Sequence, residues 1–100
     1  MEKIKLSKPI TVGEGDAKKT VEEVDLSGLD TLAGADIEFC IAQADAAKSG
    51  VMVMFELDAD FHAEVAARVT GLSRKQMREL PALDYARIIR PIRNFFAGSD

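Results

Sequence analysis

The stretch that decides the fold is residues 65–85, which read VAARVTGLSRKQMRELPALDY. It predicts two helices, the joint between them, and the beginning of a third helix. Ser73 and Gln76 have the spacing of a capping box, in which a hydroxyl and an amide bond reciprocally to the backbone at a helix start. Gly71 stands where the preceding helix must leave right-handed geometry, and a residue without Cβ does so at least cost. Residues close together in the sequence therefore specify the joint between the first two helices.

The same joint also matches the tight turn of a DNA-binding helix-turn-helix, which needs a small residue, a glycine four positions later, a hydrophobe and a polar cap. The residues that satisfy this pattern are Ala67, Gly71, Leu72 and Ser73. In such a protein, the side chains that face DNA would be Arg74, Lys75 and Arg78. The recognition helix would be short, because Pro81 ends it. A small DNA-binding regulator is therefore the alternative function.

Composition and charge limit the classes of protein to consider. One hundred residues with 47% hydrophobic and 30% charged side chains are typical of a single folded domain spanning residues 1–100. The net charge of −4 makes general nucleic-acid binding unlikely to be the function, although residues 61–100 carry +3 and residues 1–60 carry −7. No apolar run is long enough to span a bilayer, and the single cysteine agrees with a reducing compartment. We expect a cytoplasmic protein.

The N-terminal residues 1–26 predict a β-hairpin. Ile4 and Leu6 alternate with polar residues, which is the period of a strand with one buried face. Pro9 places this strand at an edge or ends it, and residues 11–16 supply the turn. Residues 20–26 form the second strand, with a bulge expected near Glu22 and Glu23 because Val21 and Val24 fall on opposite faces.

Three or four helices are expected after the hairpin, so the fold class is α+β. Residues 31–49 predict a helix capped by Thr31, with apolar residues at helical spacing. Residues 51–57 read equally as a short strand or an extended linker. Residues 58–97 form the helical part: Asp58 or Asp60 caps its first helix, and Leu72 and Met77 have the spacing of a hydrophobic staple. Pro81 begins the last helix, which Pro91 should bend or split.

Residues suited to catalysis or metal binding are few, and we expect no catalytic centre, no metal site and no cofactor. His62 and Cys40 are the only histidine and thiol, and we interpret them as a surface histidine and a core cysteine. Glu56, Asp58 and Asp60 lack the spacing of a calcium loop, so we interpret them as acids that favour a helix start.

The C-terminal helix carries the candidate protein-binding site. Ile92, Phe95 and Phe96 have more apolar area than one helix face usually buries in so small a domain, and Arg90 and Arg93 flank them. Exposed aromatic rings beside arginines would bind a protein partner. Alternatively, a kink at Pro91 would let both rings enter the core.

The order of motifs resembles the tail assembly chaperone family of tailed bacteriophages over nearly the whole chain. The similar segments are the basic-apolar hairpin strand 4–10, the segment 26–36, the helix pair around 66–73, and the LPALDY motif at 80–85. The resemblance implies a chaperone that binds the tape-measure protein, delivers it to tail-tube protein, and acts in the host cytoplasm without entering the mature virion. Uneven charge and the apolar C-terminal end also lead us to expect self-association.

Overall fold

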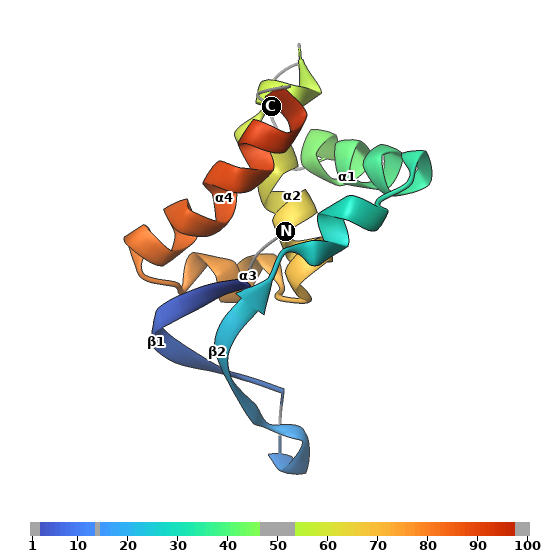
Figure 1. The fold of residues 1–100 in the computed structure, drawn as a ribbon. Helices are drawn as coiled ribbons and strands as arrows, with labels where there is room; N and C mark the ends of the chain where they lie inside the picture. Colours follow the sequence, from blue (N-terminus) through green and yellow to red (C-terminus); the bar gives the residue numbers. More distant parts are fainter. Residues whose placement is uncertain (1–2, 14, 47–53, 98–100) are drawn as a thin grey trace.

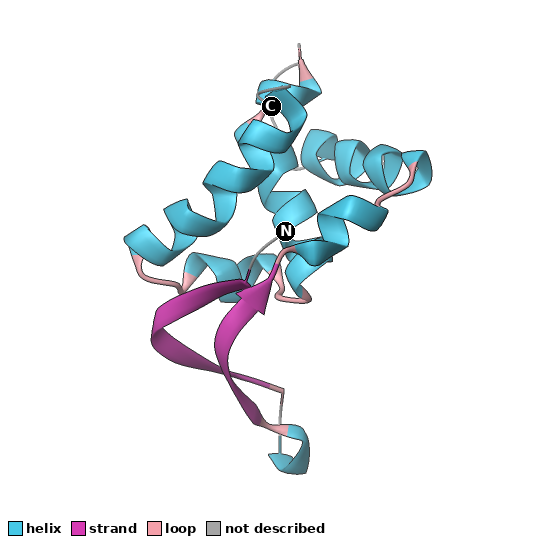
Figure 2. Ribbon diagram, in the orientation of Figure 1, coloured by secondary structure: helices cyan, strands magenta, loops and turns pink. Residues whose placement is uncertain are grey.

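The computed structural model describes residues 3–13, 15–46 and 54–97, and it confirms the α+β class. A two-stranded antiparallel hairpin extends away from a group of helices (Figures 1 and 2). The strands and α-helices are β1 (Lys3–Val12), β2 (Lys19–Asp25), α1 (Gly34–Ala46), α2 (Ala59–Thr70), α3 (Arg74–Arg78) and α4 (Ala82–Ala97). Three short 3₁₀ helices lie between them: η1 (Gly15–Ala17), η2 (Ser27–Thr31) and η3 (Phe55–Leu57).

The hairpin forms as predicted, but its irregularity lies on the first strand. Lys5 pairs with Glu23, and the next pair is Ile10 with Val21, so four residues of β1 stand opposite Glu22. The bulge was expected on β2, where the apolar residues change face. It forms on β1 instead, because Pro9 has no N–H to donate and the ladder cannot run through it. The strand continues past Pro9 to Val12, as an edge strand can.

The base of the hairpin is packed against the helices. Ile4, Leu6 and Val24 are buried in the core, together with Leu26, which follows β2. Their polar neighbours point outward, so the alternation in β1 is the expected half-buried strand. This part of the hairpin therefore belongs to the same hydrophobic core as the helices.

The first α-helix begins later than predicted, and Thr31 is not its cap. Residues Ser27–Thr31 form η2, in which the Thr31 hydroxyl donates to the carbonyl of Gly28. Helix α1 starts at Gly34, where the Asp36 carboxylate accepts the N–H of Ala33 at 2.9 Å. This hydrogen bond, and then the guanidinium of Arg68, lower the pKa of Asp36. The side chain of Thr31 therefore closes the 3₁₀ turn, and the side-chain hydrogen bond at the start of α1 is made by Asp36 instead.

Helix α2 is the central element and contacts α1, α3 and α4. Asp58 caps it by accepting the N–H of Phe61 at 3.0 Å, as predicted. Phe61 and Val65 are completely buried, and Val69 continues their stripe. The preceding residues 55–57 form the 3₁₀ helix η3 rather than a strand or an extended linker, whereas residues 51–53 lie outside the described part of the chain.

The predicted joint is confirmed in detail. Gly71 ends α2 with φ of 81° in the left-handed region, and its N–H donates to the carbonyl of Ala67. Both bonds of the capping box are present: the Ser73 hydroxyl accepts the N–H of Gln76 at 3.0 Å, and the amide oxygen of Gln76 accepts the N–H of Ser73 at 2.9 Å. Leu72 and Met77 are both buried in the core, as a staple requires.

Helix α4 runs unbroken through Pro91, so this proline does not split the helix. Pro81 lies just before the first helical residue and its carbonyl accepts the N–H of Tyr85 at 3.0 Å. Ile88 and Ile92 are completely buried, while Tyr85, Ile89 and Phe96 are half-buried along the same side. Packing of this apolar stripe compensates for the hydrogen bond that Pro91 cannot make to Arg87.

Candidate protein-interaction surface

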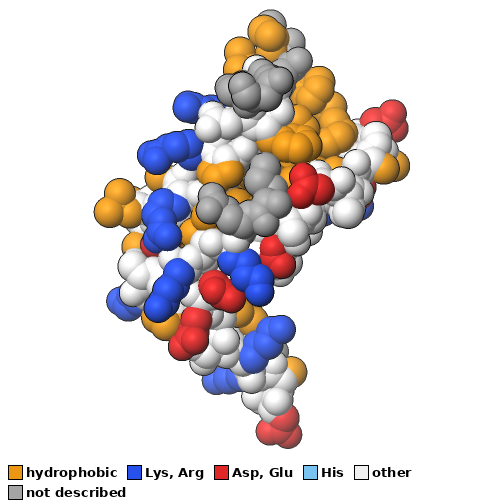
Figure 3. Space-filling model, in the orientation of Figure 1, with side chains coloured by type: hydrophobic (Ala, Val, Ile, Leu, Met, Phe, Trp, Pro, Cys, Tyr) orange, Lys and Arg blue, Asp and Glu red, His pale blue; other side chains and the backbone are white. Residues whose placement is uncertain are grey.

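The outer side of α4 presents three arginines at helical spacing. Arg87, Arg90 and Arg93 are exposed and stand three residues apart. Residues of this spacing share one side of a helix. In Figure 3, Lys and Arg side chains follow one another along the margin of the molecule where α4 runs. This side of the helix is therefore strongly positive.

The single acid of α4 does not offset this charge. Asp84 is completely buried, and its Oδ2 accepts the N–H of Ser7 at 3.0 Å and the hydroxyl of Ser7 at 2.9 Å. Arg87 donates to the other oxygen of Asp84 at 3.4 Å and to the carbonyl of Lys5 at 2.9 Å. Arg87 is thus partly engaged in holding the hairpin, whereas Arg90 and Arg93 extend from the surface.

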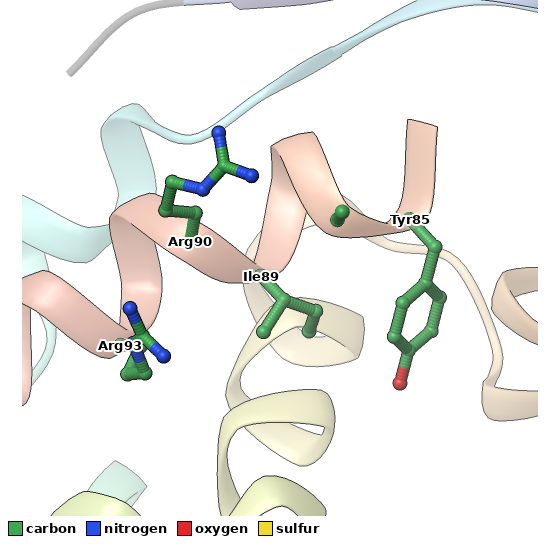
Figure 4. A pocket seen from close by; sticks show the side chains of 5 residues that line it. Tyr85, Ile89, Arg90 and Arg93 are labelled. Carbon is green, nitrogen blue, oxygen red and sulfur yellow. The ribbon is translucent and has the colours of Figure 1, made fainter. Parts of the chain in front are cut away.

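Two shallow hollows lie beside these arginines and share Arg90 as a common wall. The first has a volume of about 390 Å³ and is lined by Tyr85, Ala86, Ile89, Arg90 and Arg93 (Figure 4). The second has a volume of about 430 Å³ and is lined by Lys3, Ile4, Arg87, Arg90, Pro91 and Asn94. In the first hollow, the two guanidinium groups lie toward one end and the phenol ring of Tyr85 lies toward the other, with Ile89 in the middle (Figure 4). This hollow suits an amphipathic protein segment with a negative charge.

The predicted aromatic site is divided between surface and core. Phe95 is 42% exposed and its ring lies edge-on to Phe96, with the centroids 5.0 Å apart. Phe96 is half-buried and packs edge-on against Phe61, again at 5.0 Å. Ile92 is completely buried, so it cannot contact a partner on this surface. Arg90, Arg93 and Phe95 are the exposed residues of the predicted site. Phe95 stands two residues after Arg93, so it projects from another side of α4 than the two arginines.

The residues predicted to face DNA do not form a free basic surface. The guanidinium of Arg74 lies 2.5 Å from the Glu64 carboxylate and 3.7 Å from that of Asp60, both on α2. Helix α3, which carries it, has only five residues. Lys75 and Arg78 are exposed, but the positive charge of Arg74 is balanced by the carboxylates of α2 and is not available to DNA phosphates. The geometry thus gives the helix-turn-helix alternative no support beyond the turn itself.

The cysteine and the histidine are both buried. Cys40 lies in the core as expected, and burial raises the pKa of its thiol, which disfavours the reactive thiolate. His62 was expected at the surface and is instead only 2% exposed, with its ring 6.0 Å from that of Phe61. The prediction was wrong because α2 is covered on several sides, so positions beside its main stripe are also buried.

The acids near the start of α2 have local structural roles. Asp58 is the cap, and Asp60 forms the ion pair with Arg74 described above. Within residues 3–13, 15–46 and 54–97, no three histidine, cysteine or acidic side chains are grouped to hold a metal ion.

Sequence reasoning missed Tyr85, Ile89 and Arg87 as parts of the α4 surface. Tyr85 and Ile89 belong to the apolar stripe of α4, yet both are only half-buried and line the first hollow. The spacing of Arg87, Arg90 and Arg93 was a visible signal, because every third residue is basic and the only acid precedes them.

Comparison with known families covers nearly the whole chain. Residues 3–96 match the family model described as "Phage tail assembly chaperone proteins, E, or 41 or 14". The chain belongs to this family. The predicted resemblance of the chain to tail assembly chaperones is thereby confirmed, and the general role of the protein is in phage tail assembly.

Searches of curated proteins and of solved structures found no match. Among the residues that the structure describes, no helix is long and apolar enough to cross a membrane.

Proposed function

We propose that this tail assembly chaperone binds the tape-measure protein through the outer side of α4 and assists its assembly with tail-tube protein. It acts by binding alone, in the host cytoplasm, and is absent from the mature virion. Membership of the chaperone family supports the general role. Neither a catalytic mechanism nor a cofactor is part of the proposal.

The observation that carries this proposal is the row of exposed arginines on α4 beside a hollow with apolar walls. Arg90 and Arg93 are exposed, the acid of α4 is buried, and the hollow beside them is walled by Tyr85 and Ile89. Aromatic and arginine side chains are the residues that contribute most to protein–protein affinity. A long helical partner with acidic residues beside its apolar stripe would fill the hollow and neutralise the arginines.

Many copies are expected to bind along one tape-measure chain. Each copy then needs only a modest affinity, because neighbouring copies that also touch one another add to the total binding free energy. We therefore propose weak self-association as a second property of the protein.

Co-purification with the tape-measure protein tests the α4 surface. We expect the double change Arg90→Glu and Arg93→Glu to reduce the co-purified partner by about tenfold or more. The circular dichroism spectrum should remain helical, because these side chains are exposed.

The matched control is the double change Lys75→Glu and Arg78→Glu, which alters the net charge by the same amount. Both residues are exposed on α3, outside both hollows. This variant should bind normally. A folded Arg90 and Arg93 variant that still co-purifies as well as this control would show that α4 is not the binding surface.

A further inference from the structure

The two edges of the hairpin are not equivalent. On β1, the carbonyl of Lys5 accepts from Arg87 and the N–H of Ser7 donates to Asp84. Both backbone groups therefore point away from β2 and are already bound by side chains of α4. The outer edge of β1 is closed at its base.

This bonding also establishes which backbone groups of β2 point outward. Residues directly opposite in an antiparallel pair either both bond to each other or both point away. Because Lys5 points away and stands opposite Glu23, the N–H and carbonyl of Glu23 also point away from β1. Backbone groups alternate in direction along a strand, so the N–H and carbonyl groups of Val21 and Lys19 also point away from β1.

The outer edge of β2 is open over these residues. No hydrogen bond joins its outward backbone groups to another described segment of the chain. The hairpin extends away from the helices (Figure 1), and a hollow of about 530 Å³ borders residues 19–23 together with Lys5. An open edge is a template for another strand.

We propose that this edge pairs with the same edge of a second copy, β2 against β2 and antiparallel, around a two-fold axis at Val21. Two hairpins would then form one four-stranded sheet. The inference rests on the self-association proposed above and assigns a surface to it. It does not require α4, which remains free to bind a partner.

Charge selects the register of this pairing. With Val21 opposite its own copy, Lys19 of each chain stands opposite Glu23 of the other, which gives two attractive pairs. All of these residues have outward backbone groups, so the pairs are hydrogen-bonded ones. On the other face, Glu22 stands opposite Thr20.

The adjacent registers of the same parity are less favourable. Sliding by two residues in one direction places Glu22 opposite its own copy, although it also brings Lys19 opposite Asp25. Sliding by two residues in the other direction places Thr20 opposite its own copy and loses both Lys19–Glu23 pairs. Like charges directly opposite are destabilising. Within β2, the register centred on Val21 therefore combines two attractive pairs with no like charges directly opposite each other.

Charge reversal tests the register in solution. Sedimentation of the purified full chain should show a monomer–dimer equilibrium between micromolar and millimolar concentration. Lys19→Glu or Glu23→Lys alone should weaken dimerisation about tenfold or more, since each turns both attractive pairs into repulsive ones. Lys8→Glu, an exposed β1 residue with the same change of net charge as Lys19→Glu, is the control and should dimerise normally.

Mixing the two single variants is the decisive measurement. A Lys19→Glu chain and a Glu23→Lys chain have two opposite-charge pairs between them, so the mixture should dimerise within about threefold of the original protein. A damaged fold cannot be rescued in this way. The Glu23→Lys variant also loses the ion pair between Lys3 and Glu23. This loss should change the stability of the fold little, because both side chains are more than half exposed.

A monomeric original protein, or single variants that dimerise normally, would overturn the proposal. So would a mixture that stays monomeric. These outcomes are independent of tape-measure binding, because the sedimentation samples contain this chain alone and the α4 variants retain Lys19 and Glu23.

Discussion

At the residue scale, Asp84 joins the two parts of the molecule. Its buried carboxylate accepts two hydrogen bonds from Ser7 on β1, and it lies in the first turn of α4, where the helix dipole favours a negative charge. A buried carboxylate is stable only when its oxygens are hydrogen-bonded. Asp84 and Ser7 therefore fix the hairpin to the helix that carries the proposed binding surface.

Asp84→Ala should lower the free energy of unfolding by about 3 kcal/mol, because it removes a charged acceptor and leaves the donors of Ser7 without a partner. Ser7→Ala should cost only about 1 kcal/mol, since the backbone N–H of Ser7 still donates to the carboxylate. Urea denaturation followed by circular dichroism measures both. Asp45→Ala, an exposed change on α1, is the control and should stay within about 0.5 kcal/mol. Equal losses for Asp84 and Asp45 would contradict this role.

At the element scale, the joint between α2 and α3 is built from neighbours in the sequence. Gly71 turns the chain, the capping box starts α3, and Leu72 enters the core at the bend. Only the last of these contributions depends on the rest of the fold. The two kinds of contribution can be separated by mutation.

Ser73→Ala should cost about 1 kcal/mol of stability through the lost cap. Leu72→Ala should cost about 2–4 kcal/mol, because it also leaves a cavity among buried side chains. Urea melts of the two variants provide the comparison. If both losses were negligible, the joint would not be held by its cap and its core contact.

At the scale of the whole molecule, one hydrophobic cluster connects the hairpin to the helices. Ile4 and Val24 of the hairpin belong to the same buried cluster as Phe61 of α2 and Ile92 of α4. A two-stranded hairpin alone is marginally stable in water. We therefore expect the base of the hairpin to depend on the helices for its stability.

Unfolding in urea should then be a single transition. The helices can be followed by far-ultraviolet circular dichroism, and the hairpin by the amide signals of Ile4 and Val24 in nuclear magnetic resonance. The two midpoints should coincide. Loss of the hairpin signals at clearly lower urea would show that residues 1–26 form a separate unit.

The elements that sequence alone could predict are those whose causes are local. The capping box at Ser73, the cap at Asp58, the turn at Gly71 and the strand alternation of Ile4 and Leu6 all involve residues within a few positions of one another. The free energy of each of these local features does not depend on which distant segments of the chain pack together. The family resemblance likewise follows from the order of such local motifs.

Tertiary structure decided what depends on distant partners. His62 is buried because several elements cover α2, and Arg74 is neutralised because its helix turns back toward Glu64. Phe96 enters the core while Phe95 stays exposed, although the two are adjacent in sequence. Most consequential for function is Asp84, whose burial against Ser7, 77 residues away, leaves the arginines of α4 without an exposed acid on the same helix. Periodicity assigns a residue to a face, but only packing determines which faces are covered.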